Sequence, residues 1–206
     1  MTYSGSSNVP GASDGGRRWM SGLKLLAVLV GLMWVLEIVD TGTGGELDYF
    51  GIHPRSVEGL VGIAAAPFLH LGFGHLISNS IPLLAMGAMI AVGGAGRLLS
   101  VTAVTALVSG IGVWLFSAPG SVTIGASGVV FGYALYLIVR GIFNRSALQI
   151  LVGLVVVFVW GGSLLGGLLP QDGISLQGHL FGAIGGVIAA WLLADEKRTK
   201  TRRYAG

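Results

Sequence analysis

Long apolar stretches, separated by short polar or glycine-rich breaks, dominate the pattern of this chain. Several of them approach the roughly 20 residues that a helix needs to cross a bilayer. The first follows Lys24, runs to about Val39 and ends without a small-residue cleavage site, so we interpret it as a retained span rather than a signal peptide. The other expected spans lie at about residues 74–92, 98–116, 124–139, 147–169 and 177–194.

This pattern predicts an all-α membrane protein with one compact domain of six transmembrane helices, residues 19–195. Before it, residues 1–18 are rich in glycine and serine and are predicted to be disordered. After it, residues 196–206 form a basic tail. The break at about residues 40–69 predicts a long first loop, and its apolar second half, "GLVGIAAAPFLH", is expected to lie partly in the membrane interface.

Composition supports the membrane class. Only 10% of the residues are charged, 53% are hydrophobic, and the mean hydropathy is +0.81. Soluble domains carry about 25% charged residues, so this chain has too few charges to solvate a surface. Cysteine is absent, which excludes disulfides and thiolate metal sites.

The basic residues predict an orientation. Six spans place both termini on one side of the membrane, and eleven of the twelve basic residues then lie on that side, with only Arg55 opposite. Lys and Arg mark the cytoplasmic side. We therefore expect cytoplasmic termini and an external first loop, in a cell membrane of the bacterial type. Because these residues follow the membrane edges rather than lining one face, a nucleic-acid partner is not expected. The eleven are Arg17, Arg18, Lys24, Arg97, Arg140, Arg145, Lys197, Arg198, Lys200, Arg202 and Arg203.

Four polar residues in three different spans are predicted to lie at one shallow depth. Counted at about 1.5 Å per residue through a core of about 30 Å, Ser127 lies roughly 10 Å and His179 roughly 6 Å below the outer surface. His75 and Asn79, at the outer end of the second span, are four residues apart and share a helix face. Polar residues inside spans are costly and usually functional.

Acyl transfer is the chemistry that these residue types can perform. A serine hydroxyl becomes an effective nucleophile when a base such as His179 takes its proton. The backbone N–H of Ser127, the Asn79 amide and one ring nitrogen of His75 are candidate donors to the oxyanion. Ser127 also begins its helix, where free N–H groups and the helix dipole favour negative charge. Neither the fourth nor the sixth span has a buried acid to orient His179, so a dyad is predicted.

Glycine spacing supplies a way to assemble this site. The fourth span has Gly128 and Gly132, and the sixth has Gly178, Gly182 and Gly186. Such small-xxx-small patterns let helix backbones approach closely. Close packing of these two spans would bring the serine and the histidine within hydrogen-bond reach.

Three motifs, one each at the second, fourth and sixth expected spans, resemble those of the rhomboid family of intramembrane serine proteases. The resemblance covers about residues 20–195, in the order and topology typical of that family. The motifs are Gly125-Ala126-Ser127-Gly128 in the fourth span, "HLGFGHLISN" from His70 through His75 to Asn79 at the second, and His179 followed by Gly182 and Gly186 in the sixth.

The resemblance implies a role for each of these residues. Ser127 resembles the nucleophile, His179 the general base, and His75 and Asn79 the oxyanion donors, while His70 resembles a structural histidine. Structural positions near the site are Gly125, Gly128, Phe131 and Gly182. The implied activity is a serine endopeptidase that cleaves transmembrane segments of other membrane proteins near the outer face, within the bilayer and without cofactor or metal.

The chain departs from the family pattern at two places. Val61 and Gly62 occupy the positions in the first loop where many rhomboids carry Trp-Arg, so this loop is expected to be anchored differently. Phe131 occupies a position that is often tyrosine packed on the base; it keeps the ring and loses the hydroxyl.

Alternatives remain at this stage. Ser127 can be a small packing residue between helices. His70, His75 and His179 can form a zinc site, although the chain lacks His-Glu-x-x-His and the serine would then have no role. A non-catalytic relative that binds transmembrane helices usually lacks the serine or the base. A transporter or channel usually has repeats or acidic residues at midplane, and neither is found in the spans after the first.

Overall fold

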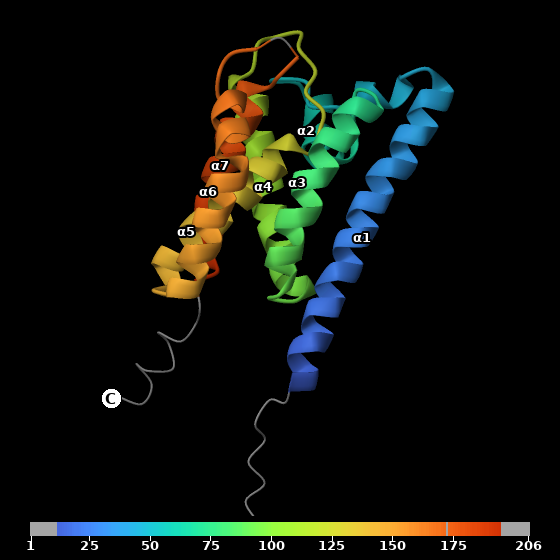
Figure 1. Cartoon of the computed structure of the whole chain (residues 1–206). Helices are drawn as coiled ribbons and strands as arrows, with labels where there is room; N and C mark the ends of the chain where they lie inside the picture. The colour runs from blue at the N-terminus through green and yellow to red at the C-terminus, as the bar shows by residue number, and fades with distance from the viewer. Residues whose placement is uncertain (1–11, 172, 195–206) are drawn as a thin grey trace, which may run out of the picture.

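The computed structural model describes residues 12–171 and 173–194. Within these ranges the regular structure is helical apart from one isolated bridge between Ile52 and Thr123. Long helices stand side by side as a bundle, and the short helix α2 lies across one end of it (Figure 1). The elements are α1 (Ala12–Thr43), η1 (Glu46–Phe50), α2 (Glu58–Ala65), η2 (Ala66–Phe68), α3 (Phe73–Ala91), α4 (Ala95–Phe116), α5 (Ser127–Asn144), α6 (Ala147–Gly167) and α7 (Leu176–Leu192).

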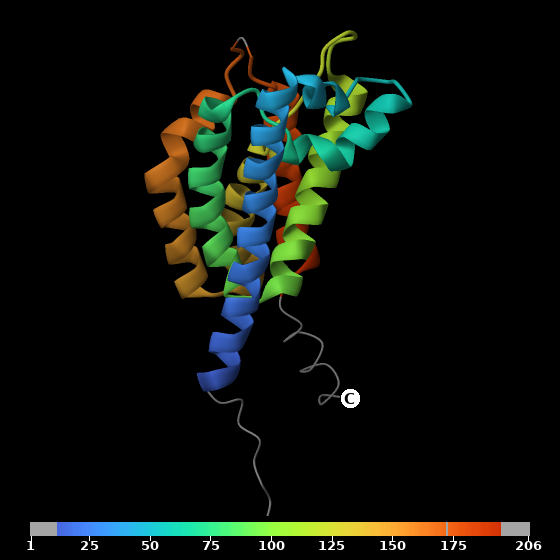
Figure 2. The same ribbon diagram turned by 90° about the vertical axis from the view of Figure 1, so that its right-hand side faces the viewer.

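The six expected spans correspond to α1 and α3 to α7, which confirms the all-helical membrane fold. Five of these helices are long and apolar enough to cross a membrane on their own, whereas α7 is a shorter apolar helix of 17 residues. The beginning of α1 and the end of α7 lie at one end of the bundle, away from the first loop, residues 44–72 (Figure 2). We call the end that carries this loop the loop end.

Helix α1 is longer than the apolar pattern indicated. It has 32 residues, or about 48 Å at 1.5 Å per residue, and extends past the other helices away from the loop end (Figure 2). Residues 12–18 are therefore helical, although disorder was expected up to residue 18; one turn of this part is braced by Arg17 donating to Asp14. Residues 1–11 and the expected basic tail lie outside the described residues.

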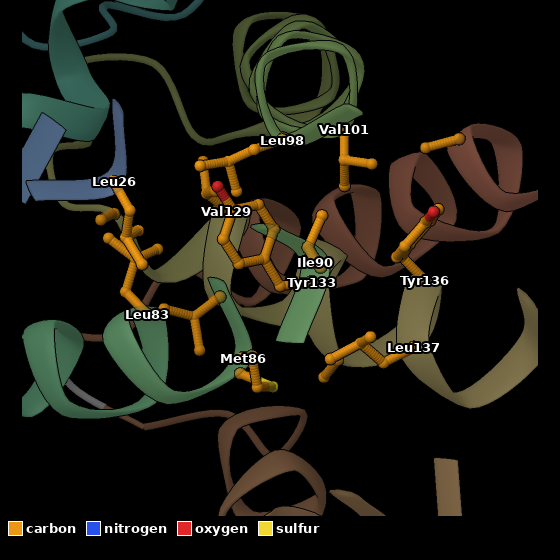
Figure 3. Packing of buried hydrophobic residues seen from close by; sticks show 14 of the residues in the cluster. Leu26, Leu83, Met86, Ile90, Leu98, Val101, Val129, Tyr133, Tyr136 and Leu137 are labelled. Carbon is orange, nitrogen blue, oxygen red and sulfur yellow. The ribbon is translucent and has the colours of Figure 1, made fainter. Parts of the chain in front are cut away.

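The hydrophobic core surrounds α5. Of the span in α5, 56% is buried inside the protein, compared with 11% for α6, because α5 packs against α3, α4, α6 and α7. Figure 3 shows Tyr133 and Leu137 of α5 among buried side chains from α1, α3 and α4. These neighbours include Leu26, Leu83, Met86, Ile90, Leu98 and Val101. The helix that carries the proposed nucleophile is thus the most enclosed span.

Helices α5 and α7 pack backbone against backbone, as the glycine spacing led us to expect. A Cβ atom added at Gly182 would lie 2.1 Å from the carbonyl oxygen of Gly128, and one at Gly186 would lie 2.1 Å from that of Gly132. Any side chain here would force the helices apart. The hydroxyl of Ser109 on α4 adds a hydrogen bond of 2.8 Å to the Gly178 carbonyl, which ties α7 to α4 as well.

Candidate active site

The backbone that leads into Ser127 requires glycine at one position. Gly125 has φ +114°, and a Cβ atom there would lie 2.6 Å from Cε1 and 2.8 Å from Nε2 of His75. A left-handed backbone and the imidazole both exclude a side chain. The chain then enters α5, of which Ser127 is the first residue. Its N–H is one of the first four of the helix, which have no partner within the helix.

The two residues before Ser127 are hydrogen-bonded to the first loop. Gly125 donates its N–H to the Ala66 carbonyl at 2.8 Å, and Ala126 donates to Nε2 of His70 at 3.3 Å. His70 is 1% exposed, and burial, with His75 beside it, lowers its pKa to about 4. A neutral ring with its proton on Nδ1 is what this acceptor role needs. His70 therefore contacts the backbone beside Ser127, in keeping with a structural function.

His75 and Asn79 lie in the first turns of α3 and face the same backbone. The N–H of Leu71 donates to His75 Nδ1 at 3.4 Å, which leaves the ring proton on Nε2, the atom next to Gly125. Asn79 is 5% exposed and donates from Nδ2 to the His75 carbonyl at 3.2 Å. The same Nδ2 lies 3.8 Å from the Cβ position of Gly125. Two side-chain donors, His75 Nε2 and Asn79 Nδ2, thus lie beside Gly125, which precedes Ser127 by two residues in the chain.

The imidazole of His179, in the first turn of α7, is held by a hydrogen bond at Nδ1 and by an aromatic ring stacked on its face. Its Nδ1 lies 2.7 Å from the Gly167 carbonyl, which can only accept, so Nδ1 carries the proton and Nε2 is left as a base. The Phe131 ring stacks on the imidazole, with centroids 4.1 Å apart and planes 10° from parallel. Gly167 must be small here, since a Cβ atom would lie 2.7 Å from Phe131 Cζ and 3.0 Å from His179 Nδ1.

The orienting group of His179 was not predictable from residue types. A general base is commonly oriented by an acid, whereas the partner here is the backbone carbonyl of Gly167 at the end of α6. Ser175 also has a role that the sequence reasoning missed: its hydroxyl accepts from the Gly178 N–H at 3.1 Å and caps α7 four residues before His179. A serine three residues before the first glycine of the sixth span is the signal that could have identified this cap.

One cavity of about 920 Å³ at the loop end joins the candidate residues. Ser127 and the three polar residues around it all line this cavity, as do Phe131 and Gly167. Helices α3 and α6 both contribute to its lining, with further hydroxyl groups from Ser78 and Ser163. A cavity of this size and polarity can hold water and several residues of an extended peptide.

The remaining histidine is separate from this site. His53 lies in the first loop, where its Nε2 is 2.8 Å from the Tyr49 carbonyl, and it does not line the cavity. Across residues 12–171 and 173–194, no three His, Asp or Glu side chains are placed to hold a metal ion. His70 and His75 instead use their ring nitrogens on backbone N–H groups.

Comparisons with known proteins agree with the expected family. A model of the rhomboid domain matches residues 58–196. The chain is 41% identical over 198 residues to an uncharacterized protein of Mycobacterium tuberculosis (strain H37Rv), an alignment that covers 92% of this chain and 82% of that protein. It is 29% identical over 138 residues to the putative rhomboid protease YdcA of Bacillus subtilis, covering 66% and 67% of the two chains. Over 179 residues it is 29% identical to the rhomboid protease GluP of Bacillus subtilis, covering 84% and 34%.

Proposed function

Because this chain belongs to the rhomboid family, we propose that it is a serine endopeptidase that cuts transmembrane segments of other membrane proteins with a Ser127–His179 dyad. The observation that carries the proposal is that Ser127, His179, His75 and Asn79, from three different helices, line one and the same cavity. We assign the catalytic domain to residues 19–195.

In the first step, Ser127 Oγ attacks the carbonyl carbon of the scissile bond while His179 Nε2 takes its proton. Nδ1 keeps its proton and donates it in a hydrogen bond to the Gly167 carbonyl, so the imidazolium that forms is held in place without a carboxylate. The imidazolium then gives its proton to the leaving amine, and the peptide bond breaks to leave an acyl-enzyme. Water attacks the ester carbonyl while His179 takes its proton; the bond from the carbonyl carbon to Ser127 Oγ then breaks, His179 returns the proton to Oγ, and the second product leaves as a carboxylic acid.

The oxyanion of each tetrahedral intermediate is assigned to the donors around Gly125. These are the Ser127 N–H, the Asn79 amide and the Nε2–H of His75. Nε2 carries the ring proton because Nδ1 of His75 accepts the hydrogen bond from the Leu71 N–H. Free N–H groups at the start of α5 add a favourable field. Donors that are already in place cost no reorganisation at the moment of reaction.

Substrates of this proposed protease come from the bilayer. Helix α6 forms one wall of the cavity and exposes most of its apolar surface on its other sides, so lipid surrounds the cavity wall. A transmembrane helix hides its carbonyl groups in its own hydrogen bonds and must unwind before Ser127 can reach one. Segments with small or helix-breaking residues near the loop end are the expected targets.

Labelling with a serine-reactive fluorophosphonate tests the proposal directly. The purified wild-type chain must react, and the Ser127→Ala chain must not. Equal labelling of both chains would show that the reactive hydroxyl lies elsewhere.

We further propose that the loop end faces outward and that both termini are cytoplasmic, on the distribution of the basic residues. The chain has no native cysteine, so single cysteines can be introduced at Ser13 and Thr43, near the two ends of α1. A membrane-impermeant maleimide added to intact cells is expected to label position 43 and not position 13. The opposite pattern would reverse the orientation.

Loss of a side-chain oxyanion donor is expected to slow turnover more than it weakens substrate binding. The oxyanion exists only after attack begins, and interactions made only in the transition state act on kcat. We expect Asn79→Ala and His75→Ala to lower kcat, by up to about 10²–10³ as in soluble proteases. Steady-state kinetics on a transmembrane reporter provide the measurement. A tenfold rise in KM (about 1.4 kcal/mol) at unchanged kcat would make Asn79 a substrate-binding group instead.

A further inference from the structure

Arg55 has an unfavourable backbone conformation. Its φ is +57°, in the left-handed region, and among the described residues only Arg145 shares this property without being glycine. Glycine or asparagine fits such a position better than arginine does. At Arg55 the contacts of the side chain offset this cost.

The Arg55 side chain holds the first loop onto the end of α4. Its guanidinium donates to the carbonyl oxygens of Leu115 at 2.8 Å and Ser117 at 2.9 Å. Its own N–H donates to the Trp114 carbonyl at 3.0 Å, and the Trp114 indole donates back to the Ser56 carbonyl at 2.8 Å. The last carbonyls of a helix have no partner within it, and a cation is favoured at that end. We call these four hydrogen bonds the Arg55 latch.

The loop that carries this latch also holds the chain that leads to the nucleophile. Ile52, three residues before Arg55, pairs with Thr123 in both directions, with hydrogen bonds of 2.9 and 3.1 Å. Together with the bonds from Ala66 to Gly125 and from His70 to Ala126, these make four hydrogen bonds from the first loop to residues 123–126. Ser127 follows directly.

The loop has little room to absorb a displacement between these two sets of bonds. A Cβ atom at Gly62 of α2 would lie 2.2 Å from the Gly51 carbonyl, and one at Gly59 would lie 1.9 Å from the His53 carbonyl. On the opposite side, a Cβ atom at Gly51 would lie 2.6 Å from Ile124 Cγ2. Residues 51–53 are thus enclosed between α2 and residues 122–124, so a shift at Arg55 passes to the segment before Ser127.

We propose that Arg55 is a positioning residue for Ser127: its guanidinium fixes the first loop to α4 and thereby sets where the nucleophile lies relative to His179 and the oxyanion donors. This inference rests on the proposed hydrolase function. It also accounts for how the loop is anchored here, since Val61 and Gly62 have no side-chain hydrogen-bond donors.

Replacement of Arg55 by glycine separates the guanidinium from the backbone conformation. Arg55→Gly removes both guanidinium bonds yet suits the left-handed backbone, so the fold is expected to be retained. The measurement is the kinetics of fluorophosphonate labelling of the full-length chain, as a maximal rate and a half-saturating concentration. We expect the maximal rate to fall by about 10- to 100-fold, because small misplacements of reacting groups cost rates of this order, with little change in half-saturation.

Three further variants distinguish positioning from general destabilisation. Arg145→Gly makes the same change at the other left-handed arginine, an exposed residue at the end of α5 far from the loop end, and should label at the wild-type rate. Arg55→Lys, which retains a cationic donor, should recover part of the rate. Trp114→Phe removes the indole bond to Ser56 and part of the ring that packs on the first loop, and should lower the rate in the same direction as Arg55→Gly.

The outcomes separate this inference from the proposed function. If the wild type labels at Ser127 and Arg55→Gly labels equally fast, the positioning role is wrong while the hydrolase proposal stands. If Arg55→Gly loses rate only in proportion to a lower Tm, and Arg55→Lys recovers neither, the latch is purely structural and the inference fails. If the wild type does not label at all, both proposals fail.

Discussion

The Ser127→Ala chain is expected to fold normally and to cleave no transmembrane substrate. The substitution removes one oxygen from a half-buried side chain at the start of α5 and leaves the backbone and its donors in place. Without the hydroxyl no acyl-enzyme can form, so the loss should be complete within detection. His179→Ala should have the same effect, because no other histidine can replace it as the base. Among the described residues that line the cavity the only other histidine is His75, whose Nδ1 already accepts the Leu71 N–H.

A second serine in the same cavity provides the control. Ser163 on α6 also lines this cavity, and Ser163→Ala removes a hydroxyl from it. It should cleave a transmembrane reporter at the wild-type rate, with both variants showing the wild-type Tm. Proteolysis by purified Ser127→Ala at a near-wild-type rate would refute the assignment of the nucleophile.

Gly182→Ala is expected to destabilise the protein and to abolish most of its activity. The added Cβ atom would lie 2.1 Å from the Gly128 carbonyl, a backbone atom that cannot rotate away. Helices α5 and α7 would have to separate, which costs at least the roughly 1–3 kcal/mol typical of overpacking. Because Ser127 lies on one of these helices and His179 on the other, the separation also draws the proposed nucleophile and base apart.

Gly162→Ala on α6 is the matched control for this change. A Cβ atom at Gly162 meets nothing within 4 Å, so the same substitution there introduces no clash. Alanine is favoured over glycine within a helix by about 1 kcal/mol, and the variant should be at least as stable as the wild type. Thermal unfolding in detergent provides the comparison. Equal Tm values for the two variants would mean that the α5–α7 contact tolerates a methyl group.

The expected membrane spans and the actual helices differ mainly at their ends. Apolar runs reveal where a helix crosses lipid, but α1 begins at Ala12 because polar residues can continue a helix beyond the bilayer, as Asp14 and Arg17 do with their ion pair. Hydropathy indicates whether a segment lies in lipid or in water, but it carries no information on the hydrogen bonds and ion pairs that the segment makes. The start of a helix in water therefore depends on local contacts that the apolar pattern does not contain.

The residues of the candidate site were predictable because their signals are local. His75 and Asn79 are four residues apart and share a face of one helix whatever its neighbours are. Gly128 and Gly182 belong to spacings that allow close packing, and residue types alone reveal them. Such relations depend only on the geometry of a single helix, so the sequence by itself determined them.

Only the tertiary structure decided what holds these residues in place. His179 is oriented by the carbonyl of Gly167, and the backbone before Ser127 is held by Ala66 and by the latch at Arg55. Every residue has a carbonyl and an N–H, so a backbone partner leaves no mark in the sequence. Which of them meets a given side chain is set by how helices cross and where a loop folds back, and these are properties of the whole packed chain.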